Sequence, residues 1–315
     1  IMEFLAELWS AGAQEPAFAR AIDLTHQWLV REMTALEGYF YAAQDADSFV
    51  TPNDVEPEEG AFYVWRYDEL QALLPIPTLT ALSEQFTLSV EGNFEGQNVL
   101  QRCQSGTLDE PAETALAALF EERYGQPPAA VMTFPPARNN AVAKGHPWPK
   151  RIPAVTDTKM IVAWNSLMIS GLARAAAVFD QRDYYEMAAC AAEVILQNQW
   201  VAGRRQRLNY EGTVAVPAQS EDYALLIKAL LDLHQVANRW PDVAAAATWH
   251  RHAIDIQAEF DQGLWSAEIG GYYNTATDAS DHLLVRERTY QDSATPSANG
   301  IAISNLVRLA LLTED

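Results

Sequence analysis

Apolar residues recur at helical spacing along most of the chain, and this pattern predicts a mostly α protein. The expected helical segments lie near residues 2–11, 16–36, 67–74, 110–124, 158–179, 183–200, 221–239, 243–261 and 297–312. Pro16 stands early in the second segment, Pro241 separates two long ones, and Thr295-Pro296 precedes the last. Because proline favours the first helical turn and a hydroxyl before it caps that turn, these positions mark helix boundaries.

Short aromatic runs lie between the expected helices and predict the strands of small hairpins, at residues 38–41, 61–65 and 271–273. Residues 38–46 can be laid on residues 271–279 with matching Gly, Tyr, Ala and Asp, which is a weak internal repeat. Helical hairpins that each need a neighbour to bury their apolar stripe close into a solenoid or a ring. We therefore expect an all-α toroid of paired helices around a central cavity, with short β-hairpins at its mouth.

The domain organisation is expected to be one toroid domain over residues 1–315. Residues 126–155 are rich in proline, which removes donors and biases the preceding residues to extended conformations, so we expect a long loop within the domain. The chain opens inside a helical pattern at residues 1–5, and the amphipathic segment 301–310 has no later helix to cover it. We expect a fragment of a longer chain, incomplete at both ends.

The charge of the chain bears on its partners. Lys and Arg number 21 against 42 Asp and Glu, giving a net charge of −21, which repels phosphate backbones and anionic membrane surfaces. No uninterrupted apolar stretch reaches the roughly 20 residues of a membrane span. Cys103 and Cys190 lie far apart without a C-x-x-C, so neither disulfides nor thiol redox chemistry is indicated. We expect no nucleic-acid or membrane partner and a cytoplasmic location.

Polar clusters with aromatic neighbours stand at the starts of three long helices, within residues 157–165, 220–223 and 292–299. In a ring of helix pairs, the N-terminal ends of alternate helices converge at one mouth of the cavity, where their N–H groups and dipoles point. These clusters are therefore expected to share one pocket. The alternative is that Asp157, Ser220 and Thr295 simply cap their helices.

Paired carboxylates divide acid and base roles when their surroundings separate their pKa values, as in glycosidic hydrolysis. The candidate catalytic residues are Asp45, Asp157, Glu221, Asp222 and Asp292. Aromatic side chains beside polar groups suit sugar rings, whose apolar faces stack while their hydroxyls bond. The candidate substrate-binding residues are Tyr41, Asp47, Trp65, Lys159, Trp164, Asn165, Tyr223, Tyr272, Ser297 and Asn299. The alternatives are solvated acids and packed core aromatics.

Metal and nucleotide chemistry find no support in the motifs. His250 and His252 are two apart on an expected helix, so they point to different faces and do not form an i, i+4 metal pair. There is no Walker loop and no G-x-G-x-x-G. We expect neither a metal nor a cofactor.

Several ordered blocks together resemble a known family. They are Glu37-Gly38-Tyr39-Phe40-Tyr41 leading to Asp45-Ala46-Asp47-Ser48, Glu59-Gly60-Ala61-Phe62-Tyr63-Val64-Trp65, Asp157-Thr158-Lys159 with Trp164-Asn165-Ser166-Leu167-Met168, Glu221-Asp222-Tyr223-Ala224, and Ala294-Thr295-Pro296-Ser297-Ala298-Asn299. The blocks resemble the thioredoxin domain-containing proteins of the spermatogenesis-associated type, over nearly the whole chain. Thr158 and Glu221 depart from that family's paired aspartates, and Ser166 and Ala298 replace glycines.

The resemblance implies an (α/α)6 toroid related to six-hairpin glycosidases and N-acylglucosamine 2-epimerases. In whole family members the resemblance implies a thioredoxin-like domain before the toroid. We expect no such domain within residues 1–315. The leading hypothesis is a carbohydrate-active or sugar-binding toroid that takes a small sugar-like molecule, with glycosidase- or epimerase-like acid/base chemistry at the cavity. The alternative is a non-catalytic binding module that accompanies the thioredoxin-like redox domain.

Overall fold

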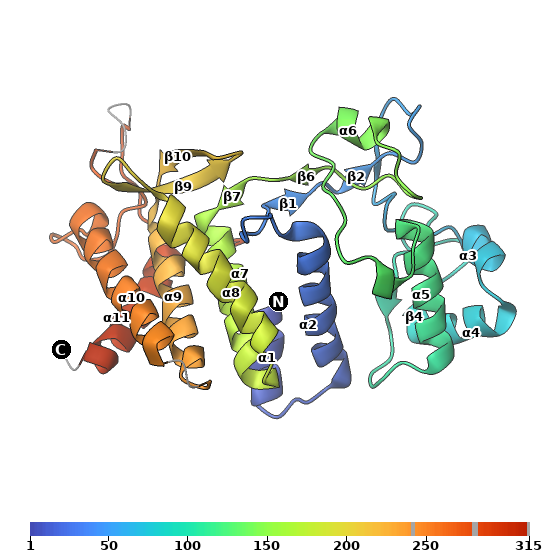
Figure 1. The fold of residues 1–315 in the computed structure, drawn as a ribbon, viewed down its shortest axis with the longest axis horizontal. Helices are drawn as coiled ribbons and strands as arrows, with labels where there is room; N and C mark the ends of the chain where they lie inside the picture. Colours follow the sequence, from blue (N-terminus) through green and yellow to red (C-terminus); the bar gives the residue numbers. More distant parts are fainter. Residues whose placement is uncertain (241–242, 279–282, 314–315) are drawn as a thin grey trace. The chain divides into compact units, whose positions relative to one another are not determined.

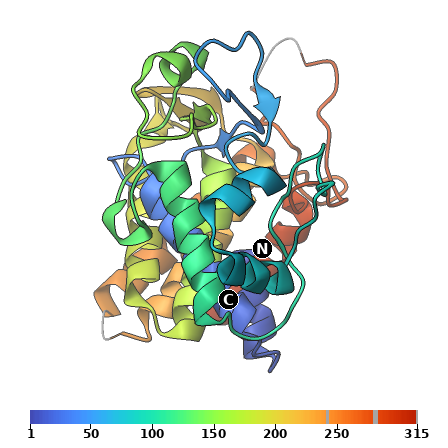
Figure 2. The same cartoon turned by 90° about the vertical axis from the view of Figure 1, so that its right-hand side faces the viewer.

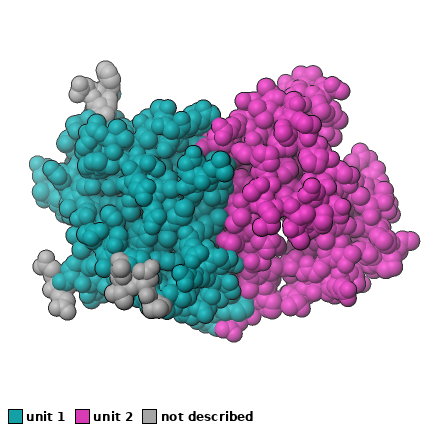
Figure 3. Space-filling view, viewed as in Figure 1, with its two compact units in different colours: residues 1–13, 34–42, 159–315 teal, residues 14–33, 43–158 magenta. Residues whose placement is uncertain are grey.

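The computed structural model describes residues 1–240, 243–278 and 283–313, and within them the chain is helix-rich with small sheets. Two compact units share the chain (Figure 3). Unit 1 comprises residues 1–13, 34–42 and 159–315, and unit 2 comprises residues 14–33 and 43–158. Each unit is therefore built from segments that are far apart in the sequence.

Unit 1 consists of long helices and one small antiparallel sheet. Its helices are α1 (Met2–Ser10), α7 (Val162–Phe179), α8 (Arg182–Asn198), α9 (Ser220–Ala237), α10 (Val243–Leu264) and α11 (Ala298–Thr313). Its strands are β7 (Met160–Ile161), β8 (Trp200–Val201), β9 (Arg204–Tyr210) and β10 (Thr213–Pro217). Strand β9 pairs with the other three strands, so it is the centre of the sheet.

Helices α1, α7, α9 and α11 of unit 1 run in the same direction, side by side (Figure 1). Trp9 and Phe179, near the last turns of α1 and α7, have ring centroids 5.0 Å apart. Asn305 of α11 donates to the Ala224 carbonyl of α9 at 2.7 Å. Helix α8 returns beside α7 and α10 returns beside α9. The N-terminal ends of α7, α9 and α11 lie at one end of unit 1, whereas α1 begins beside the middle of α7, where Met2 lies against Gly171.

Judged by length and composition only, helix α7 is long and apolar enough to cross a membrane. Its sequence is rich in alanine, and 61% of it is buried inside the protein. Small side chains let neighbouring helices approach closely, and here α8 and α9 both pack on α7. Its apolar character is accounted for by this packing.

Unit 2 consists of shorter helices joined by long connections. Helix α2 (Pro16–Trp28) continues directly into a π-helix, η1 (Leu29–Met33), and α3 (Tyr67–Leu73), α4 (Ile76–Gln85), α5 (Glu110–Tyr124), the 3-10 turn η2 (Pro128–Ala130) and α6 (Asn140–Gly145) follow. Three two-stranded sheets pair β1 (Ala43–Gln44) with β6 (Thr156–Asp157), β2 (Asp47–Ser48) with β3 (Glu58–Glu59), and β4 (Phe86–Thr87) with β5 (Gln101–Arg102).

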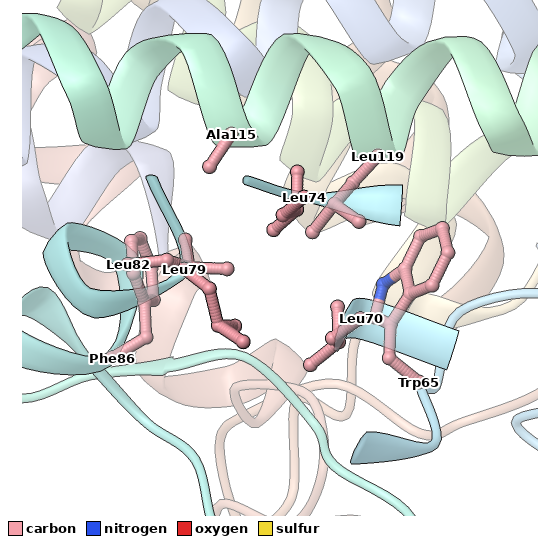
Figure 4. Packing of buried hydrophobic residues seen from close by; sticks show 8 residues of the cluster. All are labelled: Trp65, Leu70, Leu74, Leu79, Leu82, Phe86, Ala115 and Leu119. Atoms are coloured by element: carbon pink, nitrogen blue, oxygen red, sulfur yellow. The ribbon is translucent and has the colours of Figure 1, made fainter. Parts of the chain in front are cut away.

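The core of unit 2 lies where α3 and α4 meet α5 (Figure 2, cyan, teal and green). Trp65, Leu70, Leu82 and Leu119 belong to one hydrophobic cluster there, and all four are almost completely buried (Figure 4). Removing such side chains from water is the main stabilising term for this unit.

The helices expected from apolar periodicity are present, with shifts of a few residues at their ends. Helices α4 and α6, however, were not expected from the pattern, and the last turns of the segment 16–36 form a π-helix instead. The three aromatic runs were wrongly predicted as strands, because each contributes only an isolated bridge, at Phe40, Trp65 and Tyr272. The region 126–155 lies in unit 2 and holds η2 and α6.

Candidate functional site

A buried carboxylate joins the starts of two helices in unit 1. Asp222, in the first turn of α9, has no exposed side-chain surface. It accepts hydrogen bonds from the backbone N–H of Ala163 at 3.0 Å and of Gln219 at 2.9 Å, and from Nη1 of Arg207 at 2.9 Å. Ala163 belongs to the first turn of α7 and Arg207 to β9, so one side chain ties three elements together.

Glu221 extends this connection toward α11. Its Oε1 lies 2.6 Å from Nη2 of Arg207, and its Oε2 accepts from Oγ1 of Thr295 at 3.5 Å, the limit of hydrogen bonding. Thr295 precedes α11, so the starts of α7, α9 and α11 meet around these side chains. We call Arg207, Glu221, Asp222 and Thr295 the helix-start cluster.

The members of the helix-start cluster differ in what can reach them. Burial raises the pKa of Asp222 to about 6, although Arg207 and the Gln219 N–H favour its ionised form. Asp222 is enclosed, and its hydrogen bonds position the starts of α7 and α9. Glu221 and Arg207 keep 25% and 18% of their side-chain surface exposed, so a ligand can contact both.

Two asparagines among the candidate binding residues hold backbone segments in place. Asn165 of α7 accepts from the Phe40 N–H at 2.7 Å and donates to the Phe40 carbonyl at 2.9 Å. Asn299 of α11 makes the same pair of bonds to Tyr272, at 2.7 and 3.1 Å. Phe40 is therefore the structural equivalent of Tyr272, one residue away from the alignment suggested by the repeat. Both amides are buried, and each also donates to a second carbonyl, Asn165 to Ile161 at 3.2 Å and Asn299 to Thr289 at 3.0 Å.

The remaining polar candidates of unit 1 lie near the same helix starts. Asp292 is exposed and accepts from the Ser297 N–H at 2.8 Å, so it caps the approach to α11, while Ser297 is buried. Tyr41 and Lys159 are partly exposed. No three His, Cys, Asp or Glu side chains within the described ranges converge as metal ligands.

The aromatic candidates of unit 1 differ in exposure. Trp164, in the first turn of α7, keeps 42% of its surface exposed. Tyr223 and Tyr272 are buried, and both stack on the ring of Phe260, at centroid distances of 5.3 and 3.7 Å. The Tyr272 hydroxyl donates to Asp261 at 2.5 Å. Trp164 is thus the aromatic candidate of unit 1 with most surface for a ligand.

Unit 2 brings its own acidic candidates together. Ala43 lies opposite Asp157 in the β1–β6 pair, and the Asp45 N–H continues this ladder by donating to the Val155 carbonyl at 2.8 Å. Asp45 and Asp157 are therefore diagonal neighbours on one face, which places such Cα atoms about 7–8 Å apart. Asp47 follows in β2, opposite Glu59. Trp65 has no exposed surface and belongs to the core, so its ring cannot stack on a ligand.

Comparison with curated proteins finds several relatives, three of which share one name. The chain is 31% identical to spermatogenesis-associated protein 20 of Mus musculus over 317 residues, and 32% identical to that of Rattus norvegicus. These proteins are homologues of the chain. An uncharacterised Caenorhabditis elegans protein is 28% identical over 304 residues. The alignments cover 91% of this chain but 37% of the mouse and rat proteins, and no family model matches.

Proposed function

We propose that this chain is a sugar-binding or carbohydrate-active part of an (α/α)6 toroid, and that unit 1 takes a small polyhydroxylated molecule at the N-terminal ends of its parallel helices. The observation that carries the proposal is the partly exposed Arg207–Glu221 pair of the helix-start cluster. A guanidinium and a carboxylate in contact offer donors and acceptors to neighbouring hydroxyls of one ring.

Two further features support a sugar-like ligand at this end. Trp164 stands one residue after Ala163, whose N–H bonds Asp222, and its exposed ring suits the apolar face of a sugar. The starts of α7, α9 and α11 add the positive ends of their dipoles, which favour hydroxyl and other oxygen acceptors. A ligand here would meet an aromatic surface, an ion pair and helix N-termini together.

Within this proposal, the acid/base roles in unit 1 belong to Glu221 and Asp292, because Asp222 is enclosed. Asp45 and Asp157 of unit 2 remain candidates on their own small sheet. Glycosidase- or epimerase-like chemistry at these carboxylates is the catalytic form of the proposal.

The second candidate is a non-catalytic binding module within a longer protein that also carries a thioredoxin-like domain. The bonds of the helix-start cluster favour this candidate. Arg207 neutralises the charge of Glu221, and the carboxylate of Asp222 accepts three hydrogen bonds that hold structural elements together. The chain spans about 37% of the length of its curated relatives, and the activity of the whole protein is part of this proposal.

Calorimetric titration with a panel of neutral mono- and disaccharides tests the proposal. We expect at least one sugar to bind the wild-type chain, and Glu221→Gln and Trp164→Ala to weaken it by about tenfold, which is the loss of one charge-assisted bond or one stacking contact. Glu186→Gln is the control, since Glu186 pairs with Arg182 on the surface of α8. Formation of a product from a bound sugar would favour the carbohydrate-active form over the non-catalytic binding module. If no sugar binds, both candidate functions are refuted.

A further inference from the structure

A second feature of unit 1 is a surface pocket of about 420 Å³ on the α10 side of α9. Its walls come from the β8–β9 turn, the start of α9, the end of α10 and residues 276–278. The side chains that matter below are Trp200, Arg204, Tyr223, Glu259, Gln262 and Asp278. Of these, only Tyr223 was expected from the sequence to bind a ligand.

One arginine holds two walls of this pocket. The side chain of Arg205 is 6% exposed, and its guanidinium lies 5.5 Å from the centroid of the Trp200 ring and 3.3 Å from a carboxylate oxygen of Glu259. The neighbouring Arg204 pairs with Asp278. Adjacent arginines of β9 therefore fix an aromatic ring and two carboxylates around the pocket.

The pocket also presents uncharged donors. Tyr223 is held by stacking on Phe260, with the two rings 3° from parallel, and burial raises its pKa to about 12, so its hydroxyl stays protonated. Gln262 adds an amide, which both donates and accepts. Burial also raises the pKa of Glu259, although Arg205 opposes the shift.

The charges around the pocket cancel in pairs, Arg204 with Asp278 and Arg205 with Glu259. A charged ligand would have to displace one of these partners, whereas hydroxyl groups can bond to them without doing so. Trp200 keeps 45% of its surface exposed and can stack on an apolar ring face. The volume lies at the lower end of the range of about 300–1,000 Å³ for ligand pockets, which suits a small molecule.

We propose that this pocket binds the ring of a neutral, polyhydroxylated small molecule, with Trp200 as the stacking surface and Glu259 as the main hydrogen-bond acceptor. The proposal rests on the proposed function for the sugar-like class of ligand, and it adds a second binding place in unit 1 that shares no residue with the Arg207–Glu221 pair. Arg205 is a positioning residue, because it acts through Trp200 and Glu259.

Titration of the full chain with neutral monosaccharides and with glucuronate tests this inference. We expect the neutral sugars to bind more tightly than the acid, and Trp200→Ala and Glu259→Gln each to weaken them by about tenfold, from the loss of stacking or of an acceptor. Trp265→Ala is the matched control, since Trp265 is 46% exposed and does not line the pocket. It should change the dissociation constant less than twofold.

The outcomes separate the two proposals. If neutral sugars bind and only Glu221→Gln and Trp164→Ala weaken them, the pocket is not a sugar site, but the proposed function stands. Equal affinity for glucuronate would overturn the assignment of a neutral ligand. If no sugar binds, both proposals fail. Circular dichroism and thermal unfolding of Glu259→Gln and Trp200→Ala identify any loss that comes from unfolding, and in that case Glu259→Asp and Trp200→Phe replace them.

Discussion

Replacing Arg207 with methionine should destabilise unit 1 in a pH-dependent manner. The substitution removes the cation 2.9 Å from the enclosed carboxylate of Asp222 while keeping an unbranched side chain. Two backbone N–H donors remain on Asp222, but no counter-charge does. Leaving a buried carboxylate without its partner costs about 3–5 kcal/mol. For a unit of this size, that lowers the melting temperature by about 6–20 °C.

The sign of the pH dependence follows from the pKa of Asp222. Burial already raises this pKa to about 6, and loss of Arg207 raises it further. An acid whose pKa is higher in the folded state than in the unfolded chain stabilises the fold while it is protonated, and that contribution disappears as pH rises through the folded value. The deficit of Arg207→Met should therefore be small near pH 5 and large near pH 8.

Urea unfolding at several pH values between 5 and 8.5 measures this deficit, read from midpoints at an unchanged m value. Arg182→Met is the control, because Arg182 forms a largely exposed pair with Glu186 and surface pairs contribute little. Adding Asp222→Asn to Arg207→Met should recover part of the loss, since no buried charge then remains. A loss below about 1 kcal/mol that is the same at all pH values would show that the pair does not hold these helix starts together.

Two further predictions concern local packing and titration. Gly38 has φ +104°, and a Cβ added there would clash with Sγ of Cys190, whereas Gly212, at φ +80°, has open space around it. Gly212→Ala should therefore cost only the backbone strain of about 1–2 kcal/mol, and Gly38→Ala should cost more. Adding Cys190→Ala to Gly38→Ala should recover the difference, measured by urea unfolding. Burial and the neighbouring His234 lower the pKa of His250, so stability should fall as pH drops below 6.5. His250→Gln should flatten that part of a stability profile recorded from pH 5 to 7.5, and an unchanged slope would contradict the assignment.

The sequence allowed the helices to be predicted because their apolar spacing is a local property. Helix α4 was not predicted because it begins Ile76-Pro77 and carries several hydroxyl residues. Helix α6 was not predicted because it is only six residues long, which is too short to show a periodic pattern. The aromatic runs have strand-forming residues, but strands form only where a partner backbone extends, and each run finds a single bridge. The π-helix at residues 29–33 has no signature in a pattern of period 3.6.

The meeting of the three helix starts was predictable, but the contacts of their side chains were not. Asp and Glu at a helix start indicated the convergence of α7 and α9, but the enclosure of Asp222 depends on Arg207 from β9. Asn165 reaches a backbone 125 positions away in the chain, so its bonds could not be foreseen from local sequence. Trp200 and Glu259 meet only through Arg205, and the single local signal was the row of arginines in β9.

The arginines of β9 explain how the pocket and the helix-start cluster both arise in unit 1. In a chain with twice as many acids as bases, Arg204, Arg205 and Arg207 each pair with carboxylates from a different segment. Alternate residues of a strand share a face, so Arg205 and Arg207 stand on the same side of β9, about 7 Å apart along it. The pocket and the helix-start cluster are then neighbours supported by one strand.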